Sequence, residues 1–223
     1  MDLTLFNDLA EALTTLKTIG EELSQLPVLP LKDLNPEKTV LLHIDIVDGF
    51  LHTGALSSPR AASILPYVVD LNERLADFSK IFILDEHPDD AVEFRAYPPH
   101  CVAGSGESEL VDDLKVFAEN AYIFKKNSTN LLHAPGFLDL LDEHPEWETF
   151  LIVGVVTDIC VLQGALTLKT YFDQLQWKKR LVVLTKGVDT YDLPAAMHDA
   201  TLMNLFTLYN LQMNGIELYE DVH

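Results

Sequence analysis

The sequence predicts a three-layer α/β/α domain around a mainly parallel sheet of five or six strands, preceded by an extra N-terminal helix. Two observations lead to this fold class. Apolar runs of strand length alternate along the chain with longer segments in which apolar residues recur every three or four positions. The expected strands are apolar on both faces, as strands are when helices cover both sides of a sheet. Such alternation produces right-handed crossovers between parallel strands.

Five apolar runs predict the strands in chain order. They cover residues 39–46 (TVLLHIDI), 81–84 (IFIL), 121–124 (AYIF), 149–156 (TFLIVGVV) and 180–184 (RLVVL). Each run is rich in leucine, β-branched or aromatic residues, which fit the buried surface of a sheet.

Longer segments with helical periodicity lie between these runs and after the last of them. Helices are expected over residues 60–78, 108–116, 135–141, 160–175 and 194–211. In each of the first four segments, apolar residues recur at three- and four-residue spacings, which place them on one face of a helix.

The chain length of 223 residues suits one substantial α/β domain and is short for two. We assign residues 39–223 to this domain and residues 1–38 to a helical extension and linker. The first 26 residues form an amphipathic pattern, which Pro27 and Pro30 end because proline cannot continue a helix. The extension packs either on the domain or against a neighbouring subunit, and in the second case the protein is a homo-oligomer.

The composition excludes several classes of partner. Asp and Glu number 35 against 15 Lys and Arg, and the resulting charge of -20 repels nucleic acid and anionic lipid. No stretch reaches the roughly 18 consecutive apolar residues of a membrane span, and the N-terminus lacks the features of an export signal. The two cysteines, Cys101 and Cys160, are expected to be reduced. We therefore expect a soluble, cytoplasmic protein that acts on a small molecule and binds neither nucleic acid nor membrane.

Polar side chains follow four of the five expected strands. They are Asp45 and Asp48 after the first strand, Asp85 and His87 after the second, Lys125 and Lys126 after the third, and Thr157, Asp158 and Cys160 after the fourth. In an open parallel sheet, ligands bind outside the carboxyl ends of the strands. We therefore expect a carboxylate, a metal-type pair, an amine and a thiol to meet at one edge of the sheet.

Cys160 is the candidate nucleophile in this set. It would begin a helix directly after a buried strand, where unpaired N–H groups and the helix dipole favour the thiolate. An isolated cysteine is more often a buried structural residue, but the polar neighbours favour the catalytic interpretation. Asp45 ends an apolar run, where a carboxylate must be paired, and it is the candidate general base. Strand alternation leaves open whether Lys125 or Lys126 points inward to pair with Asp45.

A second group of residues has the character of a metal site. Asp85 and His87, then Glu93 and His100, form a mixed set of carboxylates and imidazoles that can bind zinc, iron or manganese. Taken alone, each of these residues is more often a turn or cap residue than a metal ligand. Two prolines that follow Tyr97 stiffen the approach to His100 because proline fixes φ.

Taken together, these motifs resemble the nicotinamidase branch of the isochorismatase-like cysteine hydrolases. The matching segments are Asp45 to Phe50, Asp85-x-His87, Tyr97-Pro-Pro-His100-Cys, Lys126 and Gly154-Val-Val-Thr-Asp-Ile-Cys160. The resemblance runs in order from about residue 40 to residue 211. The Gly-x-x-Thr-Asp-x-Cys segment indicates the superfamily, and the Asp-x-His and Pro-Pro-His pair indicates the nicotinamidases. One departure is Val47, where many relatives carry glutamine, and it loosens the inference about the substrate.

The resemblance implies a catalytic triad of Cys160, Asp45 and Lys126 on a Rossmann-like sheet. Lys126 is favoured over Lys125 because the family lysine precedes a short polar loop. The resemblance also implies an oxyanion hole formed by the backbone N–H groups of Val156 and Cys160, with a cis peptide bond before Val156.

A divalent metal ion is also implied, with Asp85, His87 and His100 as its ligands and Glu93 as a further one. Zinc is our first choice, and iron or manganese is the alternative. These expectations define the cofactor of the site.

The implied reaction converts nicotinamide to nicotinic acid and ammonia through a thioester on the cysteine. The metal would dock the pyridine nitrogen of this small carboxamide, and the ring would lie between Phe50 and Tyr97. The alternative is a related cysteine amidohydrolase that acts on carbamoyl, ureide or biuret-like substrates. Such compounds lack the ring nitrogen, so an enzyme for them would have little use for the three metal ligands together.

Overall fold

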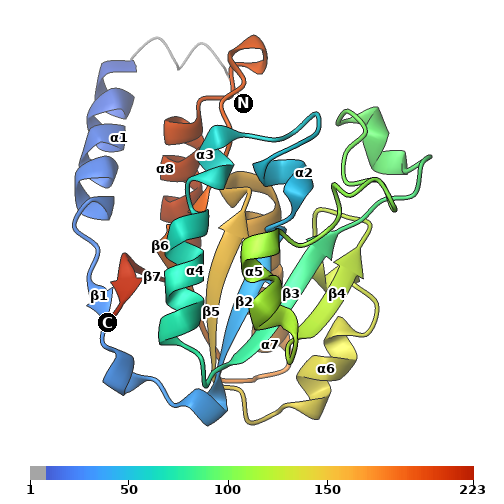
Figure 1. Cartoon of the computed structure of the whole chain (residues 1–223). Coiled ribbons are helices and arrows are strands. Elements are labelled where there is room, and N and C mark those ends of the chain that lie inside the picture. Colours follow the sequence, from blue (N-terminus) through green and yellow to red (C-terminus); the bar gives the residue numbers. More distant parts are fainter. Residues whose placement is uncertain (1–8) are drawn as a thin grey trace.

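The computed structural model describes residues 9–223, and its central element is a sheet of six parallel strands (Figure 1). The strands lie in the order β4-β3-β2-β5-β6-β7, and each pairs with its neighbours in the parallel sense. Their bounds are β2 Thr39–Ile44, β3 Ser79–Asp85, β4 Tyr122–Lys126, β5 Thr149–Val155, β6 Arg180–Asp189 and β7 Glu217–Tyr219. The chain enters at β2, builds one half of the sheet outward through β4, and builds the other half from β5 to β7. The topological switch point therefore lies between β2 and β5.

The five strands expected from the sequence are confirmed, and β7 is the sixth. β7 has only three residues, which is too short for a periodic pattern to show. β6 continues to Asp189, five residues beyond the predicted end, after a change of register between Ile152 and Gly154 of its neighbour β5. The predicted first strand is shorter than expected, because the backbone turns at Asp45, whose φ is 54°.

Helices cover both faces of the sheet, which confirms the three-layer architecture (Figure 1). One hydrophobic core joins one face to α4 and α5, and a second core joins the other face to α6, α7 and α8. The helices are α2 Asp48–Leu51, α3 Pro59–Ala62, α4 Leu65–Arg74, α5 Asp112–Ala118, α6 Phe137–Glu143, α7 Leu162–Gln174 and α8 Ala200–Met213. Over residues 9–223, no helix combines the length and the apolar character that a membrane crossing requires.

The helices differ from the sequence prediction at three places. The segment expected as one helix over 60–78 forms α3 and α4, and Pro66 lies in the first turn of the second, a position that proline favours. The last predicted helix starts later than expected, because the Asp199 carboxylate accepts a hydrogen bond from the Leu202 N–H and caps α8. Cys160 lies in a π-helical turn, Thr157–Val161, that precedes α7.

The N-terminal extension contacts the C-terminal part of the same chain. Helix α1, Leu9–Leu23, packs beside α8, and strand β1, Val28–Leu29, pairs in parallel with β8, Asp221–Val222. The part of the predicted helix over residues 1–8 lies outside the described residues. Packing on the domain is therefore observed, while the division at residue 38 and a contact with a second subunit stay predictions.

Gly154 allows β2 and β5 to approach closely just before they reach the site. Its φ is 139°, and a Cβ at this position would lie 2.1 Å from the carbonyl oxygen of Ile44. No real side chain tolerates that distance to a backbone atom, so the close approach requires glycine. The carboxyl ends of the two central strands are consequently held side by side.

Candidate active site

The ends of four neighbouring strands bring four reactive side chains together. Asp45 follows β2, Asp85 ends β3, Lys126 ends β4, and Cys160 lies in the turn after β5. All four residues are at most 5% exposed. In the structure, a carboxylate, an amine and a thiol thus lie together at one edge of the sheet, as predicted from the sequence.

Lys126 lies at the centre of this group. Its Nζ is 2.8 Å from Oδ2 of Asp45, 2.7 Å from Oδ1 of Asp85 and 3.9 Å from Sγ of Cys160. Lys125 points the other way, and its Nζ bonds to Glu86 at the surface. The alternative that the strand pattern left open is therefore decided in favour of Lys126 as the inward residue.

The surroundings of these groups determine their protonation. Burial lowers the pKa of Lys126, but the two carboxylates and the sulfur around it raise that pKa well above its usual value. Burial raises the pKa of Asp45 to about 6, with Lys126 opposing the rise. Burial also raises the pKa of Cys160 well above its usual value, although Lys126 opposes this too. At neutral pH the site therefore contains an ammonium, an ionised Asp45 and a protonated thiol.

The position of Cys160 after a buried strand was expected to favour the thiolate, but the surroundings of the sulfur act in the opposite direction. Cys160 is 5% exposed and lies near two carboxylates, so loss of solvation and negative charge both disfavour the thiolate. These effects outweigh the favourable position at the start of a helical segment. The thiol consequently needs a base to become a nucleophile.

Asp45 has the geometry of that base. Its contact with Lys126 is an ion pair, and among the described residues neither of its carboxylate oxygens has a well-aligned hydrogen-bond partner. The Nζ of Lys126, which contacts this carboxylate at 2.8 Å, also lies 3.9 Å from the sulfur of Cys160, so the ammonium brings the carboxylate and the thiol together. A buried carboxylate oxygen without a donor is costly, and a proton received from sulfur would satisfy it.

Cys160, the candidate nucleophile, lies in an unusual segment of backbone. The peptide bond between Val155 and Val156 is cis, as the resemblance implied. The π-helical turn follows directly and places Cys160 beneath a pocket that Val156 also lines.

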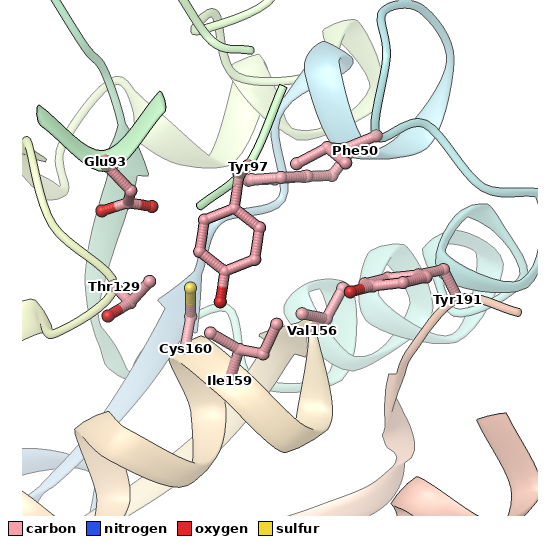
Figure 2. Close-up of a pocket in the computed structure, with 9 residues that line it drawn as sticks. Phe50, Glu93, Tyr97, Thr129, Val156, Ile159, Cys160 and Tyr191 are labelled. Atoms are coloured by element: carbon pink, nitrogen blue, oxygen red, sulfur yellow. The ribbon is translucent and has the colours of Figure 1, made fainter. Parts of the chain in front are cut away.

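The pocket above Cys160 is lined by side chains from several parts of the chain (Figure 2). They are Phe50, Leu56, Glu93, Tyr97, Thr129, Val156, Ile159, Cys160 and Tyr191. Phe50 and Tyr97 were expected to form its walls, and both line it. The sequence reasoning missed Tyr191, because it placed the end of β6 before the polar stretch that precedes this tyrosine. Had the predicted strand been extended to Asp189, Tyr191 would have followed a strand end, where site residues are expected.

Three of the four predicted metal ligands form one compact group. The potential ligand atoms of Asp85, His87 and His100 all lie within 4.8 Å of one another, and all three residues are buried. Each imidazole donates its Nδ1 proton to a fixed acceptor, His87 to Asn127 Oδ1 at 2.6 Å and His100 to the Pro98 carbonyl at 2.8 Å. The opposite nitrogen, Nε2, is thereby directed at Asp85 Oδ2, at 2.8 Å for His87 and 3.3 Å for His100.

This donor set fits a divalent metal ion. Metal-binding histidines ordinarily donate their second ring proton to a carbonyl or carboxylate-type acceptor, which fixes the nitrogen that binds the metal. Burial opposes ionisation of Asp85, but Lys126 and the two imidazoles lower its pKa below the usual range, so its carboxylate is ionised as a ligand must be.

Glu93 lies at the border of the group. Its Oε1 is 4.0 Å from Nε2 of His87 and 3.9 Å from Nε2 of His100, and its side chain is 18% exposed. The structure therefore brings Glu93 near the three compact ligands and also places it in the pocket lining. A role as a further ligand stays a prediction.

Comparison with known proteins identifies the family. A family model described as the isochorismatase domain matches residues 39–213. Nicotinamidase 1 of Arabidopsis thaliana is 28% identical over 219 residues, which cover 85% of this chain and 88% of that protein.

Solved structures share the fold. The pyrazinamidase of Pyrococcus horikoshii in complex with zinc has a TM-score of 0.66 and 22% identity, over 82% of this chain and 99% of that one. The N-carbamoylsarcosine amidase of Thermoplasma acidophilum has a TM-score of 0.64 and 22% identity, over 82% of this chain and 95% of that one. The chain belongs to the isochorismatase family, and its resemblance to the nicotinamidase branch is confirmed.

Proposed function

We propose that the protein is an amidohydrolase that converts nicotinamide to nicotinic acid and ammonia. The observation that carries this proposal is that one buried ammonium, Lys126, contacts both the base beside the thiol and a ligand of the candidate metal group. The candidate nucleophile and the candidate metal ligands therefore lie close together, on the two sides of Lys126. The similarity to Arabidopsis nicotinamidase 1 supports the same substrate.

In the proposed first half-reaction, Asp45 removes the proton from Cys160 while the sulfur attacks the amide carbon. The carbonyl oxygen becomes an oxyanion, to which the backbone N–H groups of Val156 and Cys160 donate hydrogen bonds. Asp45 then returns the proton to the amide nitrogen, the carbon–nitrogen bond breaks, and ammonia leaves a thioester on Cys160. Lys126 remains protonated throughout and keeps Asp45 ionised between proton transfers.

In the second half-reaction, Asp45 removes a proton from water as the water oxygen attacks the thioester carbon. The carbon–sulfur bond breaks, and the sulfur takes back the proton. Nicotinic acid is released and the thiol of Cys160 is restored. The same carboxylate thus acts in both steps, and the raised pKa of Asp45 suits a group that accepts and returns a proton.

Asp85, His87 and His100 would hold the metal, zinc by first choice and iron or manganese otherwise, with Glu93 as a further ligand. When bound, the metal supplies a Lewis acid that a pyridine nitrogen can coordinate. Phe50 and Tyr97 hold the ring, and both stand beside His100, with ring-centre distances of 5.6 and 6.2 Å.

A related amidohydrolase for carbamoyl or ureide substrates is the competing hypothesis. The fold does not separate the two, because an N-carbamoylsarcosine amidase shares it. The compact group of Asp85, His87 and His100 favours nicotinamide, since a substrate without a ring nitrogen leaves such a group unused.

Purified protein is expected to release ammonia from nicotinamide, and a chelator is expected to abolish the release until zinc, iron or manganese is added back. Cys160→Ala should reduce kcat by about a thousandfold or more, because the nucleophile is lost. Cys101→Ala is the matched control, since this second buried thiol has no part in the reaction.

Two outcomes of this assay would contradict the proposal. Undiminished turnover by a correctly folded Cys160→Ala variant would exclude the thioester. Hydrolysis of ureides but not of nicotinamide, whatever the metal, would favour the competing substrate class.

Asn127→Leu is expected to weaken zinc binding by roughly 10- to 100-fold, because it removes the acceptor that orients His87. Competition with a chromophoric chelator measures this affinity without any turnover. Ser128→Ala is the control, since this neighbouring side chain contacts His133 and not the metal group. Equal zinc affinity in wild type and Asn127→Leu would show that Asn127 does not support the ligand.

The rate at which iodoacetamide alkylates Cys160 in metal-free protein should fall as the pH drops through about 6. The pKa of Asp45 is raised, so its carboxylate is charged above this pH and protonated below it, when it can no longer accept the thiol proton. Peptide mapping of the labelled Cys160 measures the rate. The Asp45→Asn variant should not show this change of rate near pH 6, and its Cys160 should react only at alkaline pH. A wild-type rate that stays level well below pH 6 would contradict the assignment of Asp45 as the base.

A further inference from the structure

The loop after β6 is tied to the turn that carries the nucleophile. Asp158 lies two residues before Cys160, and its two carboxylate oxygens both accept hydrogen bonds from this loop. The hydroxyl of Thr190 donates to Oδ1 at 2.6 Å, and Nε2 of His198 donates to Oδ2 at 2.8 Å. Neither Thr190 nor His198 lines the pocket itself.

His198 also holds Tyr191, which does line the pocket. The two rings stack with their centres 4.2 Å apart and their planes 10° apart, and Nδ1 of His198 donates to the Tyr191 carbonyl at 2.9 Å. A pair of backbone hydrogen bonds between Leu193 and His198 folds the loop back so that the two rings can meet. Both His198 nitrogens face oxygen atoms, so the imidazole bridges Asp158 and Tyr191.

Tyr191 reaches the pocket from a part of the sheet that contributes no other wall. Figure 2 shows it beside Val156, across the pocket from Thr129 and Glu93. Burial raises the pKa of Tyr191, in keeping with a ring that is largely removed from solvent. The side chain therefore limits the space above Cys160 on this side.

We propose that His198 is a positioning residue that fixes Tyr191 as a wall of the substrate pocket. His198 bonds to Asp158, which lies in the same turn as Cys160, and it also bonds to and stacks on Tyr191. These two hydrogen bonds and the stacked pair of rings therefore set the distance between Tyr191 and Cys160. Together with Phe50 and Tyr97, the fixed tyrosine selects flat ring amides. This inference rests on the proposed function, because it concerns the substrate of the same site.

Steady-state kinetics with nicotinamide tests the proposal. His198→Ala and Tyr191→Leu should each raise KM by roughly 3- to 10-fold with little change in kcat, because a mobile or missing aromatic wall weakens binding of the ring. Tyr191→Phe keeps the ring and should raise KM less than Tyr191→Leu does. Met197→Asn is the matched control, because Met197 is 89% exposed in the same loop and asparagine tolerates its left-handed φ of 55°.

The double variant His198→Ala/Tyr191→Leu gives the sharper test. If His198 acts through Tyr191, the double variant should have the KM of Tyr191→Leu alone, since the wall can be lost only once. If the increases in KM of the two single variants multiply in the double variant, the proposal is overturned. A lowered kcat in His198→Ala with unchanged KM would also overturn it, because that result would place the effect on the nucleophile turn.

Two further measurements separate this proposal from the proposed function. Alkylation of Cys160 by iodoacetamide, a small reagent that needs no aromatic wall, should be as fast in His198→Ala as in wild type. A crystal structure of His198→Ala should show Tyr191 displaced from the pocket. If the wild-type protein does not hydrolyse nicotinamide, the proposed function fails. The positioning role of His198 fails separately, if Tyr191 keeps its place in the His198→Ala structure.

Discussion

The ammonium of Lys126 is the interaction on which the rest of the site depends. It is fully buried, and it is shared between Asp45 and Asp85 within 2.8 Å of each. Burying one charge alone costs several kcal/mol, and burying two carboxylates without a cation would force them to take up protons. The ammonium favours the ionised form of both carboxylates, Asp45 as the proposed base and Asp85 as a candidate metal ligand. The chemistry of both halves of the site thus depends on one side chain.

The sheet brings these charges together through its order of strands. Asp45 and Cys160 follow β2 and β5, the two strands at the switch point, and the glycine at position 154 lets these strands approach closely. Asp85 and Lys126 face each other directly across the pairing of β3 with β4. Strand pairing thus places Asp85 opposite Lys126, and the closeness of β2 and β5 places Asp45 near Cys160, so the fold itself brings these side chains together.

Much of this could be predicted from the sequence, because apolar runs and short motifs are local signals. These signals predicted the central strands and the group of polar side chains that gathers around Cys160 at the strand ends. The strand pattern alone left the choice between Lys125 and Lys126 open, because it depends on how β4 pairs with β3, and only the family resemblance favoured Lys126. Nothing in the sequence indicated that burial by distant segments raises the pKa of Cys160, against the local effect of a helix start. Tyr191 and its partner His198 were missed because a polar stretch conceals the last residues of β6 and the loop closes through long-range contacts.

The measurement that tests the central role of Lys126 most directly is a double-mutant cycle in unfolding free energy, made by urea denaturation of metal-free protein at neutral pH. Lys126→Met should lower the unfolding free energy by about 3–5 kcal/mol, because it leaves buried carboxylates without their cation. Adding Asp45→Asn should restore part of that loss, since one of the stranded charges disappears with it. If the loss of unfolding free energy in the double variant instead equals the sum of the losses in Lys126→Met and Asp45→Asn, the ammonium and the carboxylate of Asp45 are not coupled. That result would contradict the central role of Lys126.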